Sequence, residues 1–191
     1  VRPNIITANA LISACSKSGL TRQAMEVYAS LPSLGLCADA ITFNTLISSC
    51  RGANDEREET GEWELALQVL RDMQDTRPPV APNTVTYTAL ISVLERANQW
   101  QLAMRMYQEM KAAKVPADTM AYSALIRTFE QNGRWMEAME VFREMQMAGV
   151  EASTLTFNAL LRTCVRGEQW QAGVTAFESM CVAKVPADDV T

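Results

Sequence analysis

Small hydrogen-bonding side chains recur at two equivalent positions along this chain of 191 residues. The first column consists of Asn9, Asn44, Thr88, Ser123 and Asn158. The second column consists of Asp39, Asn83, Asp118, Ser153 and Asp188. An Asn amide both donates and accepts hydrogen bonds, whereas an ionised Asp only accepts them. Two such columns indicate recognition by hydrogen bonding.

Enzymatic chemistry has little support in the sequence. There is no His, no metal-ligand cluster, no Gly-rich phosphate loop and no outstanding carboxylate pair. The five cysteines lack ligand spacing, and Cys15, Cys50 and Cys164 share one position that Leu94 and Phe129 fill elsewhere. That pattern indicates buried apolar residues in a reducing compartment. We therefore expect no catalytic residue, no metal and no cofactor in this segment.

Both columns belong to a block of residues that occurs five times. Equivalent apolar tripeptides begin at residues 10, 45, 89, 124 and 159, so the spacings are 35, 44, 35 and 35. The second half of each block follows a helical i, i+3, i+4, i+7 pattern, as in Ala66, Val69, Leu70 and Met73. A fixed period of this size predicts an all-α solenoid of stacked helix-turn-helix hairpins.

Each of the last four blocks has a Trp just before its predicted second helix, and we expect this Trp to pack where the hairpin closes. The row is Trp63, Trp100, Trp135 and Trp170. The 44-residue block has seven extra residues in its turn and two more near Thr76. Its acidic turn, residues 55–64, is most simply a loop that projects into solvent, and a docking site for a partner is the alternative.

The charge distribution excludes a broad positive field. The chain has 17 basic and 22 acidic residues, a net charge of −5, and residues 55–64 contribute six acids and one base. Because basic and acidic residues are equal in number in the rest of the chain, any nucleic-acid binding must depend on a few well-placed cations and on specific contacts. No apolar run approaches the roughly 18 residues of a membrane span, so no membrane partner is expected.

Each predicted first helix opens on the motif [Tyr/Phe]-[Asn/Thr/Ser]-x-Leu-[Ile/Leu]. It occurs at residues 43–47, 87–91, 122–126 and 157–161, and Ala8 replaces the aromatic residue in the first block. Five in-phase copies resemble the pentatricopeptide repeat family, of the plain 35-residue (P-type) class. This resemblance covers residues 5–188 and implies a right-handed superhelical solenoid. The implied repeats are 5–39, 40–83, 84–118, 119–153 and 154–188, with residues 1–4 and 189–191 as parts of neighbouring repeats in a longer array.

The resemblance also implies binding of single-stranded RNA with one base read per repeat. In this family the fifth and last residues of a repeat face the base together, so the two columns form five pairs, numbered here from the N-terminus. The second residue of a repeat packs against the base plane. Here these residues are Ile6, Ile41, Val85, Met120, Leu155 and Val190.

A basic side chain midway through each repeat often meets phosphate in this family. Lys17, Arg96 and Arg166 match that position, whereas Gly52 and Gln131 depart from it. The family's pairing rule assigns Asn with Asp to U, Asn with Asn to C, and Thr with Asp to G. Read in order, the five pairs would select 5′-U-C-G-(A)-U-3′, with only a leaning towards A at the pair that contains Ser153.

Helix capping is the competing explanation for the second column, because Asp, Asn and Ser before a helix are favoured N-caps. Capping does not explain the first column, which lies inside helices where Asn and Thr are mediocre formers. A solvated helix face would also allow Lys, Glu or Ala there. The first column therefore favours base recognition.

Two functions from different classes remain open. The leading hypothesis is a sequence-selective RNA-binding array that protects a transcript, blocks RNA structure or recruits other factors. Its rival is a protein-binding scaffold within a larger ribonucleoprotein assembly, which the acidic balance and the two missing cations favour. The resemblance alone implies a mitochondrion or chloroplast and RNA-processing proteins as further partners. Members of this family also have catalytic domains outside their repeats.

Overall fold

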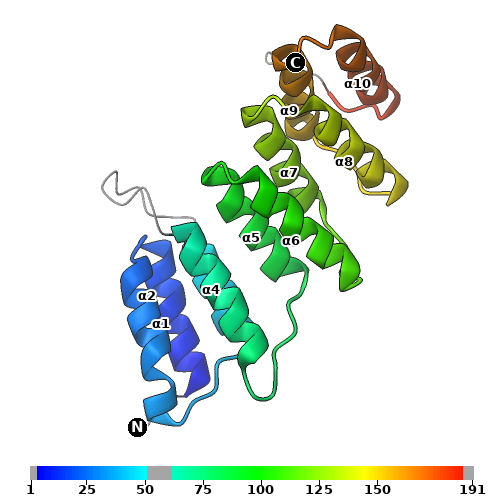
Figure 1. Ribbon diagram of the computed structural model, residues 1–191. Coiled ribbons are helices and arrows are strands. Elements are labelled where there is room, and N and C mark those ends of the chain that lie inside the picture. Colours follow the sequence, from blue (N-terminus) through cyan, green and yellow to red (C-terminus); the bar gives the residue numbers. More distant parts are fainter. Residues whose placement is uncertain (1–3, 51–61, 187–191) are drawn as a thin grey trace. The chain divides into compact units, whose positions relative to one another are not determined.

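The computed structural model describes residues 4–50 and 62–186, which form helices joined by turns and contain no strand (Figure 1). The predicted all-α class is therefore confirmed. First helices of the hairpins are α1 (Ile5–Lys17), α3 (Ala40–Ser49), α5 (Thr84–Arg96), α7 (Thr119–Gln131) and α9 (Thr154–Arg166). Second helices are α2 (Thr21–Ser30), α4 (Glu62–Asp75), α6 (Trp100–Ala112), α8 (Trp135–Met147) and α10 (Trp170–Val182). A 3-10 helix, η1 (Pro32–Leu34), follows α2. Most of the acidic turn lies outside the described residues.

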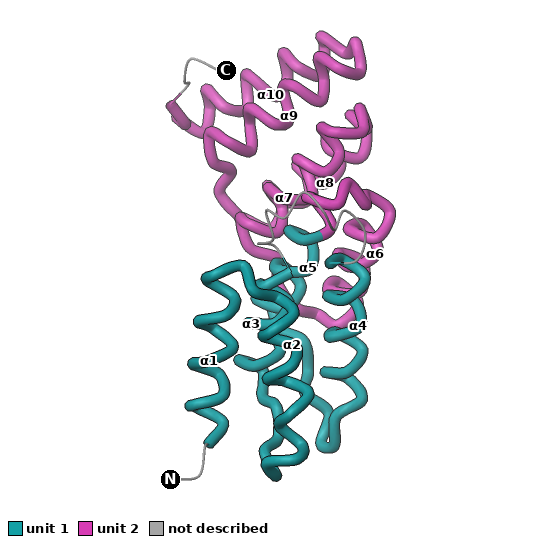
Figure 2. The backbone as a smooth tube through the Cα atoms, turned by 90° about the vertical axis from the view of Figure 1, so that its left-hand side faces the viewer, with its two compact units in different colours: residues 1–93 teal, residues 94–191 magenta. Residues whose placement is uncertain are grey.

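The chain divides into two compact units, residues 1–93 and residues 94–191, with the boundary inside α5 (Figure 2). In the first unit α1 packs against α2 and α3, and α3 packs against α4. In the second unit α7 packs against α8 and α9, and α9 packs against α10. Within each unit, a first helix thus contacts its own hairpin partner and the next first helix, as in a stacked repeat.

An aromatic pair joins successive hairpins at an equivalent place in both units. One ring belongs to a second helix, and the other is the aromatic residue that opens the next first helix. The pairs are Tyr28–Phe43, Tyr107–Tyr122 and Phe142–Phe157, with edge-on rings whose centroids are 5.7, 5.8 and 5.3 Å apart. Such pairs contribute about 0.5–1.5 kcal/mol beyond their burial. The aromatic position of the sequence motif is therefore a packing position between hairpins.

The cysteines belong to this packing where the sequence predicts burial. Cys50 and Cys164 are buried and Cys15 is half-buried, whereas Cys37 and Cys181 are exposed. Burial, with a smaller contribution from the charge of Glu62, raises the pKa of the Cys50 thiol to about 12. A thiol in this state is protonated and unreactive at neutral pH. The described residues include no cluster of His, Cys, Asp and Glu that could hold a metal ion, and none of their helices is long and apolar enough to span a bilayer.

Two members of the Trp row, Trp100 and Trp135, are covered by the turn of the following hairpin. The guanidinium of Arg134 lies over Trp100, with its Cζ 4.0 Å from the ring centroid. Gly167 approaches Trp135 so closely that a Cβ atom there would lie 2.5 Å from the Trp135 Cδ1. Trp170 is 73% exposed, so the predicted packing is wrong at this residue.

Gly167→Ala is expected to destabilise the fold by about 1–3 kcal/mol, because the new methyl group would displace the Trp135 ring. Backbone strain is not the cause, since Gly167 has a φ of −83°. Gly173→Ala is the matched control, because its Cβ would meet only the Cys164 Cβ, at 3.6 Å. This second change should stabilise α10 by about 0.5–1 kcal/mol. Urea unfolding measures both, and equal effects of the two substitutions would contradict the proposed clash.

Candidate nucleic-acid interface

The second predicted column lies at the N-termini of the first helices, where its described members act as N-caps. Asp39 Oδ1 accepts a hydrogen bond from the Thr42 N–H at 2.8 Å, and Asp118 Oδ1 accepts one from the Ala121 N–H at 2.8 Å. The Asn83 side chain caps α5 at 3.1 Å, and the Ser153 hydroxyl caps α9 at 3.3 Å. Asp188 lies outside the described residues. Capping is thus real, and it occupies one oxygen atom of each side chain.

The first two predicted pairs meet inside the first unit. Asn9, in α1, donates from its Nδ2 to the Asp39 Oδ1 at 3.1 Å. Asn44, in α3, donates from its Nδ2 to the Asn83 Oδ1 at 3.5 Å. All four side chains keep some exposure, and Asn83 is the most exposed of the four. In both pairs a residue inside one first helix therefore contacts the cap of the next first helix.

Asp39 and Asn83 differ in the polar atom that each has left after capping its helix. A backbone N–H must donate to an oxygen, so Asn83 turns its Oδ1 towards α5 and its Nδ2 group away from it. Asp39 accepts from Asn9 and Thr42 at Oδ1, so its Oδ2 keeps acceptor capacity. Burial opposes the charge of Asp39, but hydrogen bonds from Thr42 and Asn9 outweigh it and hold the pKa of this carboxyl below its usual value. At neutral pH the first pair offers an acceptor where the second pair offers a donor.

The third and fifth pairs lie differently. Thr88 is half-buried in the first unit, and its predicted partner Asp118 caps α7 in the second unit. Asn158, of the fifth pair, is only 4% exposed.

The fourth pair consists of hydroxyl groups alone. Ser123 is 6% exposed, and its Oγ lies 2.7 Å from the Thr156 Oγ1, which in turn lies 3.0 Å from the Ser153 Oγ. Ser153 has no second polar side-chain atom once it has capped α9. The geometry therefore gives this pair less to distinguish bases with than the first two pairs have.

The predicted base-packing residues are large apolar side chains exposed at one equivalent place. Each lies two residues after the N-cap of its first helix. Ile6, Ile41, Val85, Met120 and Leu155 are 74%, 63%, 57%, 58% and 52% exposed, respectively, and Val190 lies outside the described residues. Scattered exposed apolar residues need no explanation, but recurrence at one site of five helices indicates an interaction surface.

The predicted phosphate-binding cations are exposed at the C-terminal ends of the first helices. Lys17, Arg96 and Arg166 end α1, α5 and α9, and all three are exposed. Arg166 also donates from its Nη1 to the Glu130 carbonyl at 3.1 Å. Gln131 is exposed at the equivalent place in α7, and Gly52 lies outside the described residues.

Two further arginines on the first helices of the second unit were missed by sequence reasoning. Arg127 makes a two-pronged ion pair with Glu95, with Nε–Oε1 at 2.7 Å and Nη2–Oε2 at 2.6 Å. The Arg162 Nη1 lies 3.7 Å from the Glu130 Oε1. Each arginine follows a first-column residue by four positions, and therefore lies one turn along nearly the same helix face. The sequence does contain a signal for these two ion pairs, because Glu95 and Glu130 each precede their arginine by 32 residues.

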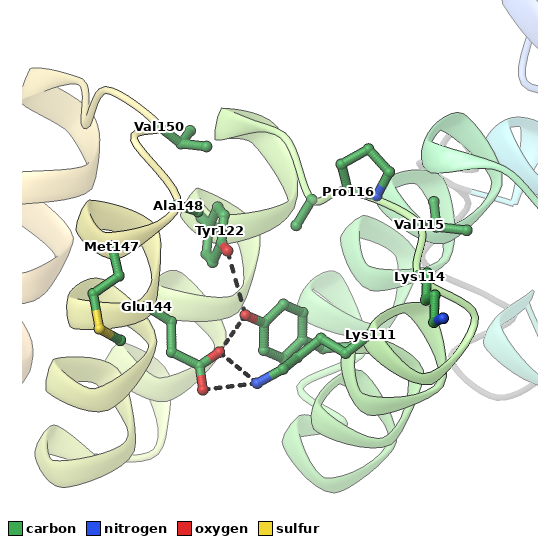
Figure 3. A pocket seen from close by; sticks show the side chains of 11 residues that line it. Lys111, Lys114, Val115, Pro116, Tyr122, Glu144, Met147, Ala148 and Val150 are labelled. Atoms are coloured by element: carbon green, nitrogen blue, oxygen red, sulfur yellow. Dashed lines mark hydrogen bonds and ion pairs between the residues drawn. The ribbon is translucent and has the colours of Figure 1, made fainter.

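A separate hollow in the second unit is lined by Tyr107, Lys111, Tyr122 and Glu144 (Figure 3). The Tyr107 hydroxyl donates to Glu144, and the Lys111 Nζ contacts both oxygens of that carboxylate at 2.8 and 2.9 Å. Burial, followed by the hydrogen bond to Glu144, raises the pKa of Tyr107. A weaker version joins Tyr28 to Asp72 at 3.5 Å in the first unit. These polar groups satisfy one another and strengthen the packing between hairpins.

Comparison with known proteins places the chain among helical-repeat proteins. A family model described as the pentacotripeptide-repeat region of PRORP matches residues 6–180. A chloroplastic pentatricopeptide repeat-containing protein of Arabidopsis thaliana is 29% identical over 103 residues, which are 54% of this chain and 11% of that protein. A mitochondrial one from the same plant is 26% identical over 107 residues, which are 56% of this chain and 14% of that protein. The chain thus spans only a small part of these relatives.

Two solved structures show the same fold at low sequence identity. The PPR domain of Arabidopsis thaliana protein-only RNase P 1, in complex with tRNA, has a TM-score of 0.80 at 19% identity and covers 95% of this chain and 93% of its own. The maize protein PPR10, in complex with an 18-nt psaJ RNA element, has a TM-score of 0.72 at 21% identity and covers 96% of this chain and 27% of its own. At these identities the likeness shows the fold alone.

Proposed function

Because the chain belongs to the pentatricopeptide repeat family, we propose that it binds single-stranded RNA and selects one base per repeat. The similar structures with tRNA and with the psaJ RNA element support RNA as the ligand. The chloroplastic and mitochondrial relatives support a role in organellar RNA metabolism, such as stabilisation, processing, editing or translation. The repeats act as a binding module, and any catalysis belongs to other parts of a longer protein.

One observation supports base recognition more than any other: an exposed apolar side chain lies two residues from each cap in all five first helices. A base has an apolar face and a hydrogen-bonding edge. In the first two repeats, Ile6 and Ile41 supply the apolar contact, and the Asn9–Asp39 and Asn44–Asn83 pairs supply the polar one. No such combination is needed for capping or for packing between hairpins.

The polarity of the caps matches the proposed bases. The accepting Oδ2 of Asp39 suits the N3–H of uracil, whereas the donating Nδ2 of Asn83 suits the N3 acceptor of cytosine. The proposed target for the five pairs is 5′-U-C-G-(A)-U-3′, with the fourth base least specified because Ser153 has only its capping hydroxyl.

A protein-binding scaffold is the second candidate. It is favoured by the net charge of −5 and by the pairing of Arg127 and Arg162 with acids, which removes two cations from contact with phosphate. Binding to RNA in this chain therefore has to come from specific contacts more than from charge.

A titration tests the proposal. Labelled RNA that contains UCGAU is compared with a strand of the same composition in scrambled order, at two salt concentrations. We expect at least about tenfold tighter binding to the target, since two well-made base contacts exceed 1.4 kcal/mol. With three exposed phosphate-facing cations, the logarithmic salt slope should be about −2 for a single strand. Comparable weak binding to both strands would reject base recognition and leave the scaffold.

A further inference from the structure

A third side chain joins the two members of a pair, and it is a buried Thr from the following first helix. The Thr42 hydroxyl lies 2.6 Å from the Asn9 Oδ1, and the Thr86 hydroxyl lies 2.7 Å from the Asn44 Oδ1. Both Thr side chains are fully buried. Each one therefore reaches from the start of one first helix to the amide inside the preceding first helix.

The hydrogen bonds give these hydroxyls a direction. Thr42 Oγ1 accepts from the Asp39 N–H, and Thr86 Oγ1 accepts from the Asn83 N–H, both at 3.1 Å. Since the amide oxygens are the nearer acceptors, each hydroxyl proton points to the Asn side chain. The Asn9 and Asn44 oxygens are thus held by Thr, and their Nδ2 groups point to the caps.

An amide held in this way cannot exchange its donor and acceptor. An unrestrained Asn side chain can turn by 180°, and the turn places a donor where the acceptor was. Uracil and cytosine present opposite donor and acceptor patterns on the same edge. Because Asn9 and Asn44 are held in the same orientation, the choice between U and C stays with the caps Asp39 and Asn83. An amide that flips would adapt to either base and weaken that choice.

We infer that Thr42 and Thr86 are specificity-determining residues that set the polarity of the base-reading amides, an inference that rests on the proposed RNA recognition. Helix capping does not account for the contact to the preceding helix. Ala121 stands at the equivalent position of α7, and the Asp118 cap is nevertheless made at 2.8 Å. The side-chain half of the cap thus forms without the hydroxyl, which adds the reciprocal bond from the cap N–H. Neither half of the cap requires the contact to the Asn of the preceding helix.

Thr86→Val tests the inference, because Val keeps the shape of Thr and removes only the hydroxyl. Binding is measured to RNAs that differ in the second base alone, C or U, and to RNAs that differ in the first base alone. We expect the preference for C over U at the second base to fall about tenfold, equivalent to about 1.4 kcal/mol. The preference at the first base should not change. Thr42→Val should give the reverse, with loss of discrimination at the first base only.

The controls separate positioning from stability. Thr128→Val removes an equally buried hydroxyl that bonds only to the Ala124 carbonyl within α7, and should leave both preferences intact. Thr86→Ser, which keeps the hydroxyl, should restore the preference for C. Equal weakening for every RNA, with the C-to-U ratio unchanged in both Val variants, would overturn the inference while leaving the proposed function standing. A wild-type chain that itself fails to discriminate would reject both.

Discussion

Replacing Asp39 by Asn is expected to change the base preferred by the first pair from U to C. An Asn at this position can still cap α3, because Asn83 caps α5 with the same geometry. The atom that remains for the base changes from the accepting Oδ2 to a donating Nδ2. Uracil N3–H then loses its acceptor, and cytosine N3 gains a donor. An unsatisfied group costs about 1–3 kcal/mol, so the ratio of U to C binding should swing by about 100-fold.

Asn83→Asp is the reciprocal control in the same chain, and it should change the second base from C to U. Binding of each variant to four RNAs, with U or C at the first and second bases, gives the complete comparison. Each substitution should act on its own base and leave the other unchanged. If both variants bind all four RNAs with unaltered ratios, these side chains act as caps alone, and the second column has no part in recognition.

Capping and base recognition, which the sequence presents as alternatives, are compatible in the structure. The carboxyl of Asp39 and the amide of Asn83 each have two polar atoms, and the cap uses one of them. Ser153 has a single hydroxyl, so the two uses compete there. This difference gives a physical reason for the ill-defined fourth base.

The hairpins and their packing could be predicted because they depend on periodicity. Ala66, Val69, Leu70 and Met73 recur at helical spacing, and all four are at most 4% exposed. Burial of Asn158 could not be predicted, because the sequence does not say what packs over a polar residue inside a helix. The Thr86 contact to Asn44 is similar, since a Thr three residues after a polar cap reads as a local capping residue until the register of adjacent helices is known.

The Glu95–Arg127 pair also depends on this register, and its loss should destabilise the fold. Arg127→Ala leaves the Glu95 carboxylate, whose side chain is 8% exposed, without its cation. Breaking a fully buried pair costs about 3–5 kcal/mol. Because the Arg127 side chain is 37% exposed, water can reach the pair, and we expect a loss of about 2 kcal/mol. Removal of both charges in Glu95→Ala/Arg127→Ala should recover part of that loss.

Arg162→Ala is the matched control, since it removes an arginine at the equivalent position of the next first helix. Its partner Glu130 lies 3.7 Å away in a single contact, and the Arg162 side chain is 49% exposed. An exposed pair of this kind contributes at most about 1 kcal/mol. Urea unfolding of Glu95→Ala, Arg127→Ala, the double variant and the wild type gives the coupling between Glu95 and Arg127 directly. Arg162→Ala is measured beside them. Similar small losses for Arg127→Ala and Arg162→Ala would show that Glu95 is hydrated in solution, and that the two-pronged contact adds little to the fold.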